Sequence, residues 1–293
     1  MRDQDYRDLL DRRAWQPERV AAAASARRRR SLWASGRQLL IIAADHPARG
    51  MIGVTGRPMA MANRADLLNR VATALSRPGV DGVLGTPDVI EDLLLLGLLD
   101  DKIVIGSMNR GGLQGSVFEF DDRFTAYTAE AIARMGFDGG KMLCRIGAED
   151  RATADTLANC AQAVTELAER GLMAMVEPFW SQVVDGVVRH DLSPEGMIRA
   201  ISVAQALGAT SARTWLKVPV VPRMEQIMAA TTLPTLLLGG DPAHAPDEVY
   251  AAWAKALRLP PVRGLVAGRA LLYPPGDDVA AAVDTAVGLL EES

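Results

Sequence analysis

The sequence is poor in cysteine, histidine and lysine. Its 293 residues include two cysteines and three histidines, and only four of its 32 basic residues are lysines. Cys144 and Cys160 are too few for a disulfide framework or a cysteine-based zinc site. His46, His190 and His244 are too scattered for a convincing metal-site spacing. We therefore expect no resident metal and no other cofactor.

Long apolar runs are missing as well. The longest uninterrupted apolar stretches, such as residues 39–44, are far shorter than the about 20 residues that cross a bilayer. Residues 1–37 are charged throughout and lack the apolar region of a secretory signal. Hydrophobic residues make up 49% and charged residues 23%, which suits one large core. We expect a cytoplasmic globular protein with no membrane partner.

Charge is unevenly distributed along the chain. The net charge is −4, yet residues 1–37 hold ten arginines against five acidic residues. The run Arg27–Arg30 lacks the interleaved aromatics and the recognisable motif of a nucleic-acid site. We interpret it as a solvated helix face or a subunit contact, and expect no nucleic-acid partner.

From residue 38 onward, short apolar runs alternate with longer amphipathic stretches. The runs expected to be strands are 38–45, 82–85, 102–107, 141–146, 172–179, 214–219, 234–239 and 263–267. The stretches expected to be helices are 62–77, 88–99, 123–135, 152–170, 194–207, 223–230, 246–257 and 278–290. The strand runs are almost continuously apolar, which is typical of a parallel sheet buried on both faces.

Eight strand–helix units in about 255 residues match the length of a TIM barrel. A doubly wound open sheet has the same alternation, but no GxGxxG fingerprint follows the first strand. The sequence therefore predicts a (β/α)8 barrel catalytic domain over residues 38–293. Residues 1–37 are expected to form a helical extension, packed outside the barrel or against a neighbouring subunit of a homo-oligomer.

A lysine inside an apolar strand needs an explanation in a chain that otherwise uses arginine. Catalytic groups of a barrel lie at the carboxyl ends of its strands, and Lys217 lies there on the sixth predicted strand. An amine desolvated in an apolar barrel mouth can form a Schiff base. A snorkelling or salt-bridged lysine is the alternative. Lys141 starts the fourth predicted strand, so we interpret it as a structural residue at the opposite face.

Two carboxylates and a set of glycines complete the candidate site. Asp45 and Glu177 end the first and fifth predicted strands, where they can move protons, or else pair with arginines. Substrate phosphate is expected on backbone amides and arginines at the ends of several strands. That set comprises Gly239, Gly240, Gly268, Arg269 and, from the fourth strand, Arg145. The alternative for the two adjacent glycines is a tight turn.

Four segments in this order resemble the class I aldolases. They are Ala43-Ala44-Asp45-His46, Leu216-Lys217-Val218-Pro219, Leu238-Gly239-Gly240-Asp241 and Gly264-Leu265-Val266-Ala267-Gly268-Arg269. The group includes deoxyribose-phosphate aldolase, tagatose-bisphosphate aldolase and the archaeal-type fructose-bisphosphate aldolases. The resemblance covers residues 38 to about 275.

The resemblance implies that Lys217 forms the Schiff base with a phosphorylated keto sugar or sugar acid. It also implies that Asp45 corresponds to the aspartate that ends the first strand in this family. Glu177 then occupies a position where different branches of the family have Tyr or Glu. The loops of strands seven and eight would hold the phosphate. Residues 45–50 read Asp-His-Pro-Ala-Arg-Gly where many relatives have Asp-His-Gly, and Pro219 follows the lysine closely. Both departures bear on the identity of the substrate rather than on the lysine chemistry.

The pattern looks closest to a branch linked with inositol breakdown. Such a substrate would be a keto-deoxy-gluconate phosphate, cleaved to dihydroxyacetone phosphate and malonic semialdehyde. Three alternatives stay open. A phosphosugar isomerase or epimerase would use Glu177 as its base. A metal-dependent aldolase would lose activity to chelators. A non-catalytic barrel would bind a sugar phosphate and act as a regulator.

Overall fold

The computed structural model describes residues 2–34, 36–109, 112–240 and 246–293. Within them the strands are β1 (Leu39–Ala43), β2 (Gly82–Gly85), β3 (Ile103–Ser107), β4 (Gly139–Ile146), β5 (Met173–Val184), β6 (Val187–His190), β7 (Thr214–Pro219), β8 (Thr235–Leu238) and β9 (Val262–Ala267). The helices are α1 (Asp3–Trp15), α2 (Arg19–Ala26), α3 (Arg64–Ser76), α4 (Pro87–Leu95), α5 (Ala129–Arg134), α6 (Ala152–Glu169), α7 (Pro194–Ala204), α8 (Met224–Met228), α9 (Pro246–Leu257), α10 (Arg269–Leu272) and α11 (Val279–Glu291). Two short 3-10 turns are η1 (Leu32–Ala34) and η2 (His46–Arg49).

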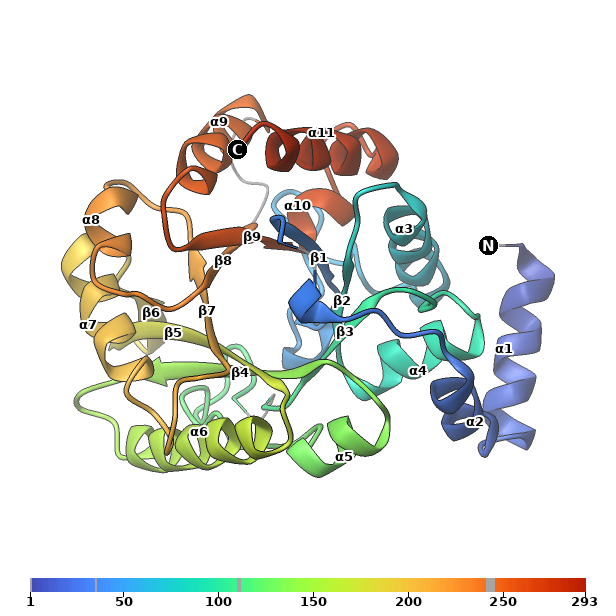
Figure 1. The fold of residues 1–293 in the computed structure, drawn as a ribbon, viewed down its shortest axis with the longest axis horizontal. Coiled ribbons are helices and arrows are strands. Elements are labelled where there is room, and N and C mark those ends of the chain that lie inside the picture. The colour runs from blue at the N-terminus through green and yellow to red at the C-terminus, as the bar shows by residue number, and fades with distance from the viewer. Residues whose placement is uncertain (1, 35, 110–111, 241–245) are drawn as a thin grey trace.

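Among the described residues, eight parallel strands close into a ring. The sheet order is β4-β3-β2-β1-β9-β8-β7-β5, and the further pairing of β4 with β5 closes it. Figure 1 shows the strands at the centre with the helices around them. The predicted TIM barrel is confirmed, and an open sheet is excluded because no edge remains between β4 and β5. Each predicted strand overlaps an observed one. Strand β6, which pairs antiparallel with β5 as a hairpin, was not predicted.

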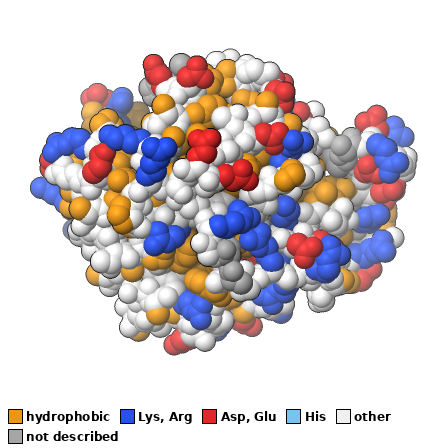
Figure 2. All heavy atoms as spheres, turned by 45° about the horizontal axis from the view of Figure 1, so that its top comes forward, with side chains coloured by type: hydrophobic (Ala, Val, Ile, Leu, Met, Phe, Trp, Pro, Cys, Tyr) orange, Lys and Arg blue, Asp and Glu red, His pale blue; other side chains and the backbone are white. Residues whose placement is uncertain are grey.

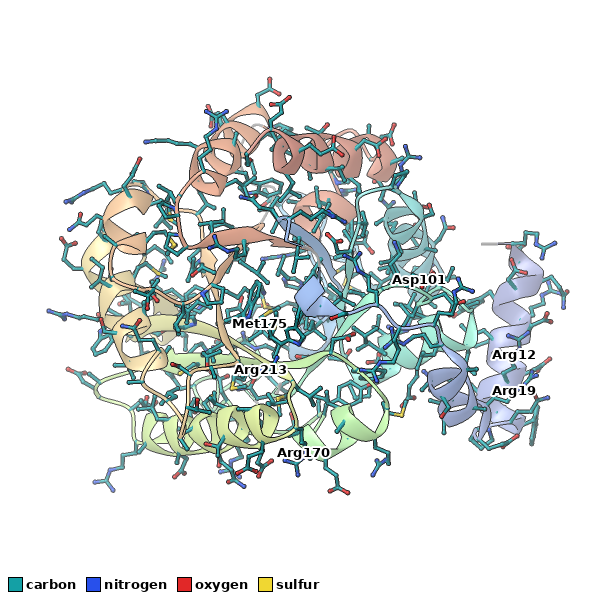
Figure 3. The ribbon with its side chains drawn as sticks, viewed as in Figure 1. Arg12, Arg19, Asp101, Arg170, Met175 and Arg213 are labelled. Atoms are coloured by element: carbon teal, nitrogen blue, oxygen red, sulfur yellow. The ribbon has the colours of Figure 1, made fainter. Side chains whose placement is uncertain are left out.

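Alternate residues of the strands fill the inside of the barrel. The interior cluster contains residues such as Ile41, Ile105, Met175, Leu236 and Val266. Met175 lies within the ring in Figure 3. Side chains of a strand alternate between its two faces, so the residue two positions after an inward-facing one also points into the barrel. The inward polar positions at the open end are therefore Asp45, Ser107, Lys141, Glu177 and Lys217.

Helices α1 and α2 lie outside the ring beside α4 (Figure 1). Arg13 on α1 forms ion pairs with Glu91 at 2.5 Å and Asp92 at 2.8 Å. The Arg12 guanidinium donates to the backbone carbonyl of Leu95 at 2.7 Å. These contacts attach the extension to the barrel of its own chain, while the domain boundary between residues 37 and 38 stays a prediction. None of the described helices is both long and apolar enough to cross a membrane.

The run Arg27–Arg30 does not lie on a helix, so the helix-face interpretation is wrong, while the alternative of a subunit contact stays a prediction. Helix α2 ends before it, at Ala26. Arg27 is buried and donates to the backbone carbonyl of Lys102 at 2.6 Å, and Arg30 forms an ion pair with the buried Asp81 at 2.7 Å. The partners lie far along the chain, where local charge patterning cannot reveal them. Figure 2 shows basic and acidic side chains interspersed over one face of the molecule.

Candidate active site

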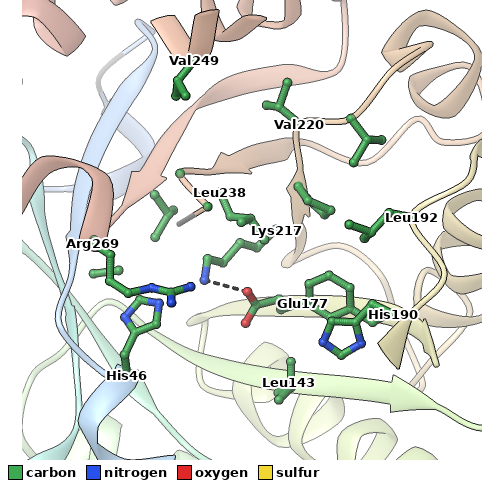
Figure 4. A pocket seen from close by; sticks show the side chains of 18 of the residues that line it. His46, Leu143, Glu177, His190, Leu192, Lys217, Val220, Leu238, Val249 and Arg269 are labelled. Carbon is green, nitrogen blue, oxygen red and sulfur yellow. Dashed lines mark hydrogen bonds and ion pairs between the residues drawn. The ribbon is translucent and has the colours of Figure 1, made fainter. Parts of the chain in front are cut away.

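Lys217 and Glu177 meet at the open end of the barrel. They lie on the neighbouring strands β7 and β5, whose residues Leu216 and Val176 pair in register. The Lys217 Nζ donates a hydrogen bond to Glu177 Oε1 at 2.8 Å (Figure 4). Both residues are buried. The sequence-predicted amine and carboxylate are therefore direct partners.

Lys141 is the second lysine of this cluster. Its Nζ forms an ion pair with Glu177 Oε2 and lies 3.6 Å from Asp45 Oδ2. Ser107 Oγ donates to the same Asp45 oxygen at 3.2 Å. The interpretation of Lys141 as a residue of the opposite face is wrong for two reasons. Strand β4 begins two residues earlier, at Gly139, and the barrel stagger places Lys141 level with Ser107, the last residue of β3.

The cluster holds two carboxylates and two amines in a buried space. Burial opposes ionisation of Glu177, but the charges and hydrogen bonds of Lys141 and Lys217 outweigh it and hold the pKa of Glu177 well below its usual value. Glu177 is therefore a carboxylate at neutral pH. Buried charges persist only when they are paired and hydrogen-bonded, and this group of four meets that condition.

A cavity of about 650 Å³ opens above the cluster. Asp45, Glu177 and Lys217 line it, and so do the predicted phosphate-binding residues Gly239, Gly240, Gly268 and Arg269. Lys141 is not among the described residues that line this cavity. Of these two buried lysines, Lys217 is therefore the one that lines the cavity.

The glycines on the β8–β9 side are required by close packing and by backbone conformation. A Cβ at Gly239 would lie 2.7 Å from the Cβ of Ala267, and one at Gly268 would contact the carbonyl oxygen of Ala43. Gly240 has a φ of 69°, which L residues rarely adopt. Gly239 and Gly240 both line the cavity, and their contact with a substrate phosphate stays a prediction. Asp241 of the same motif, like His244, lies outside the described residues.

The structure does not bring Arg145 to the cavity. Its guanidinium is buried against Asp122, with Nε 2.8 Å from Oδ2 and Nη2 2.6 Å from Oδ1, and it also contacts Glu119. Arg145 thereby ties the loop after β3 to β4, and its predicted phosphate contact has no support in this geometry. Arg49, on η2, does line the cavity, and its Nε donates to the carbonyl of Gly112 at 2.8 Å.

His46 and His190, whose sequence spacing argued against a metal site, also line the cavity. The Nδ1 of His46 lies 3.8 Å from Asp45 Oδ1. Burial, followed by the charges of Arg269 and Lys217, holds the pKa of His46 well below its usual value, so its imidazole is neutral. His190 comes from the unforeseen strand β6. Among the described residues, no group of three or more His, Cys, Asp or Glu side chains is placed to hold a metal ion.

Solved structures reproduce this architecture at two levels of similarity. The crystal structure of Cgl0159 from Corynebacterium glutamicum is 52% identical, with a TM-score of 0.97, covering 100% of this chain and 98% of that one. An archaeal fructose 1,6-bisphosphate aldolase is 16% identical, with a TM-score of 0.67, covering 94% and 100%. An archaeal fructose-1,6-bisphosphate aldolase with its catalytic Lys covalently bound to the carbinolamine intermediate of the substrate is also 16% identical, with a TM-score of 0.66, covering 92% and 99%.

At such low identity the aldolases show a shared fold and nothing finer. No curated protein sequence matches this chain. The profile described as Cgl0159-like matches residues 37–287, which is most of the chain. By that match and by the 52% identity to Cgl0159 itself, the chain belongs to the Cgl0159-like family.

Proposed function

We propose that the protein is a class I aldolase that cleaves or forms a C–C bond in a phosphorylated keto sugar or sugar acid. The observation that carries the proposal is the position of Lys217 Nζ. It borders the cavity, lies 2.8 Å from Glu177 Oε1, and shares that cavity with Gly240, Gly268 and Arg269. An amine, a proton acceptor and an anion-binding rim are the parts that Schiff-base chemistry on a phosphorylated ketone needs.

The first stage forms the iminium. Lys217 transfers a proton to Glu177 and attacks the substrate ketone, and a proton shift from nitrogen to oxygen gives the carbinolamine. Glu177 then returns its proton to the carbinolamine hydroxyl, which leaves as water. Glu177 suits this exchange because it is ionised at the outset and already hydrogen-bonded to the nitrogen that loses the proton.

The second stage breaks the C–C bond. Asp45 takes the proton from the hydroxyl that becomes the aldehyde, and the bonding electrons flow into the iminium to give an enamine. The same carboxyl group returns the proton to the enamine carbon. Water then hydrolyses the iminium, which releases the second product and regenerates Lys217. Asp45 is poised for this step by Ser107 and Lys141, which hold its Oδ2.

Lys141 acts as a positioning residue in this scheme. It contacts both Asp45 and Glu177, so it fixes the two carboxylates relative to each other and stabilises their charged forms. The phosphate of the substrate binds along Gly239, Gly240, Gly268 and Arg269, because backbone amides and a guanidinium supply the anion contacts that a protein of net charge −4 does not offer in general. A keto-deoxy-gluconate phosphate that yields dihydroxyacetone phosphate is one substrate to test, beside phosphorylated ketoses.

Borohydride trapping tests the proposal. The protein is incubated with keto-deoxy-gluconate phosphate, dihydroxyacetone phosphate or fructose 1,6-bisphosphate, reduced, digested and analysed by mass spectrometry. We expect a reduced adduct on the peptide that contains Lys217. Lys217→Met should abolish the adduct and lower turnover by more than about a thousandfold.

Lys255 provides the matched control, because it is exposed on α9 and pairs with Glu225 at the surface. Lys255→Met should trap and turn over like the wild type. An adduct on Lys141, or turnover without any adduct, contradicts the proposal. Turnover that is lost to a chelator would instead favour metal-dependent chemistry.

A further inference from the structure

The β5–β6 hairpin extends the wall of the cavity beyond the barrel. Glu177, Phe179 and Ser181 succeed one another on one face of β5, because alternate residues of a strand share a face. Ser181 stands opposite His190 in the antiparallel register of the hairpin. The strand that carries the carboxylate of the proposed chemistry thus also carries the support for His190.

His190 is fixed in position by two neighbours. Its Nδ1 lies 2.8 Å from Ser181 Oγ, and its ring stacks on Phe179 with centroids 4.2 Å apart and an interplanar angle of 18°. Phe179 and His190 both line the cavity. In Figure 4, His190 and Arg269 lie on opposite sides of the Lys217–Glu177 pair. The imidazole therefore faces the part of a substrate that is remote from the phosphate-binding side.

The surroundings also determine the protonation of this imidazole. Desolvation, followed by the charges of Arg145 and Arg49, lowers the pKa of His190 to about 4, so the ring is neutral near pH 7. Ser181 Oγ lies 3.4 Å from the Phe179 carbonyl oxygen and 2.8 Å from His190 Nδ1, and its single proton can serve only one of these acceptors. When the hydroxyl donates to Phe179, Nδ1 carries the proton of His190 and donates to Oγ.

A neutral imidazole that carries its proton on Nδ1 has an unprotonated Nε2, which is a hydrogen-bond acceptor. No described residue forms a hydrogen bond to this nitrogen. We propose that His190 is a specificity-determining residue whose Nε2 accepts a hydrogen bond from a hydroxyl group in the aldehyde half of the substrate. The inference rests on the proposed function and narrows its substrate class to a phosphorylated ketose or keto acid that is hydroxylated beyond the cleaved bond. It counts against the keto-deoxy-gluconate phosphate, because malonic semialdehyde, the aldehyde which that substrate would yield, carries no hydroxyl.

The kinetic test uses aldol addition of dihydroxyacetone phosphate to glyceraldehyde and to propanal, which lacks the hydroxyls. His190→Phe keeps an aromatic ring for stacking on Phe179 but removes the acceptor. We expect the variant to lose about tenfold or more in kcat/KM for glyceraldehyde and little for propanal, since one hydrogen bond of about 1.4 kcal/mol corresponds to tenfold. Unchanged discrimination between the two aldehydes overturns the proposal.

Two further variants separate recognition from simple support of the hairpin. Ser181→Ala keeps the His190 ring but removes the partner that selects its tautomer, and we expect a smaller loss of the same discrimination. Arg189→Ala changes a neighbouring exposed residue that pairs with Gln182 instead of Ser181. This control should discriminate between the aldehydes as the wild type does, and a loss equal to that of His190→Phe counts against the proposal.

Nitrogen-15 NMR of the imidazoles in the wild-type protein tests the tautomer without a variant that must fold. We expect a neutral Nδ1–H ring for His190 at pH 7. A ring that is protonated on Nε2 overturns the proposal. Borohydride trapping distinguishes failure of the His190 proposal from failure of the proposed aldolase activity. An adduct on Lys217 together with unchanged aldehyde discrimination supports the aldolase and contradicts only the role of His190. The absence of any adduct contradicts the aldolase activity itself.

Discussion

Lys141, the third residue of β4, lies in register with Ser107, the last residue of β3. This pairing brings an amine from near the start of one strand to the level where its neighbour ends. Both side chains reach Asp45 Oδ2 from there, Ser107 at 3.2 Å and Lys141 at 3.6 Å. The charged cluster therefore depends on the stagger of the barrel as much as on the residues at the strand ends.

Removal of Lys141 should disturb the cluster without removing the nucleophile. In Lys141→Met, Asp45 and Glu177 would share Lys217 as their cation within the cluster, and breaking a buried ion pair costs about 3–5 kcal/mol. The pKa of Glu177 should rise, because the charge of Lys141 is the largest influence that lowers it. We expect slower adduct formation on Lys217, an acid limb of kcat displaced to higher pH, and a lower urea midpoint.

The control for that experiment is Lys102→Met. Lys102 precedes β3 at the other end of the barrel, where its Nζ donates to the carbonyl of Val80 at 2.7 Å. This variant should leave the pH profile of kcat unchanged. An unaltered profile in Lys141→Met itself would show that Lys141 does not position Glu177.

Arg269 should determine the affinity for phosphate. Replacing it in Arg269→Gln removes a charged donor from the cavity, and a hydrogen bond to a charged group contributes about 1.5–3 kcal/mol. We expect KM for the phosphorylated substrate to rise about 10-fold to 100-fold, with a much smaller rise for the unphosphorylated analogue. Arg263→Gln is the control, because Arg263 is exposed on β9, the strand that precedes Arg269, and donates to the carbonyl of Pro260. Equal rises for both substrates would exclude a phosphate contact.

Arg145 should behave as a structural residue. Arg145→Met would leave the carboxylate of Asp122 buried without this partner, at a cost of about 3–5 kcal/mol measured by urea unfolding. In the fraction that remains folded, KM for the phosphorylated substrate should stay near the wild-type value. A selective loss of phosphate affinity comparable to that of Arg269→Gln would restore Arg145 as a phosphate ligand.

Stability should fall as the solution is acidified from about pH 6.5 to about pH 4. The pKa of His190 is lowered from 6.5 to about 4, so in this window the unfolded chain binds a proton that the native protein does not. His46, whose pKa is also lowered, acts in the same direction, and Glu177 adds a loss at still lower pH. Urea midpoints measured from pH 7.5 to pH 4.5 should show the slope.

His190→Phe should flatten part of that slope, because it removes one of the groups that gain a proton on unfolding. The remaining slope belongs to His46 and to the carboxylates. A variant whose midpoints fall with acid as steeply as those of the wild type would contradict the low native pKa of His190.

Much of the fold could be read from the sequence. Continuous apolar runs such as residues 214–219 predict buried parallel strands, and their eightfold alternation with helices predicts the barrel. Positions at the ends of those strands also pointed to Asp45, Glu177 and Lys217, which the structure gathers around one cavity. These features are local, because the apolar run of a strand and the position of a residue at its end depend only on neighbouring residues.

Other features depend on contacts between distant segments. Lys141 belongs to the cluster because the register between β3 and β4 sets its height along the barrel axis. Arg145 leaves the cavity because Asp122, on the preceding loop, binds its guanidinium. The sequence alone thus determined the eight parallel strands of the barrel, whereas tertiary pairing decided which charges meet, because strand stagger and ion-pair partners are set between segments rather than within them.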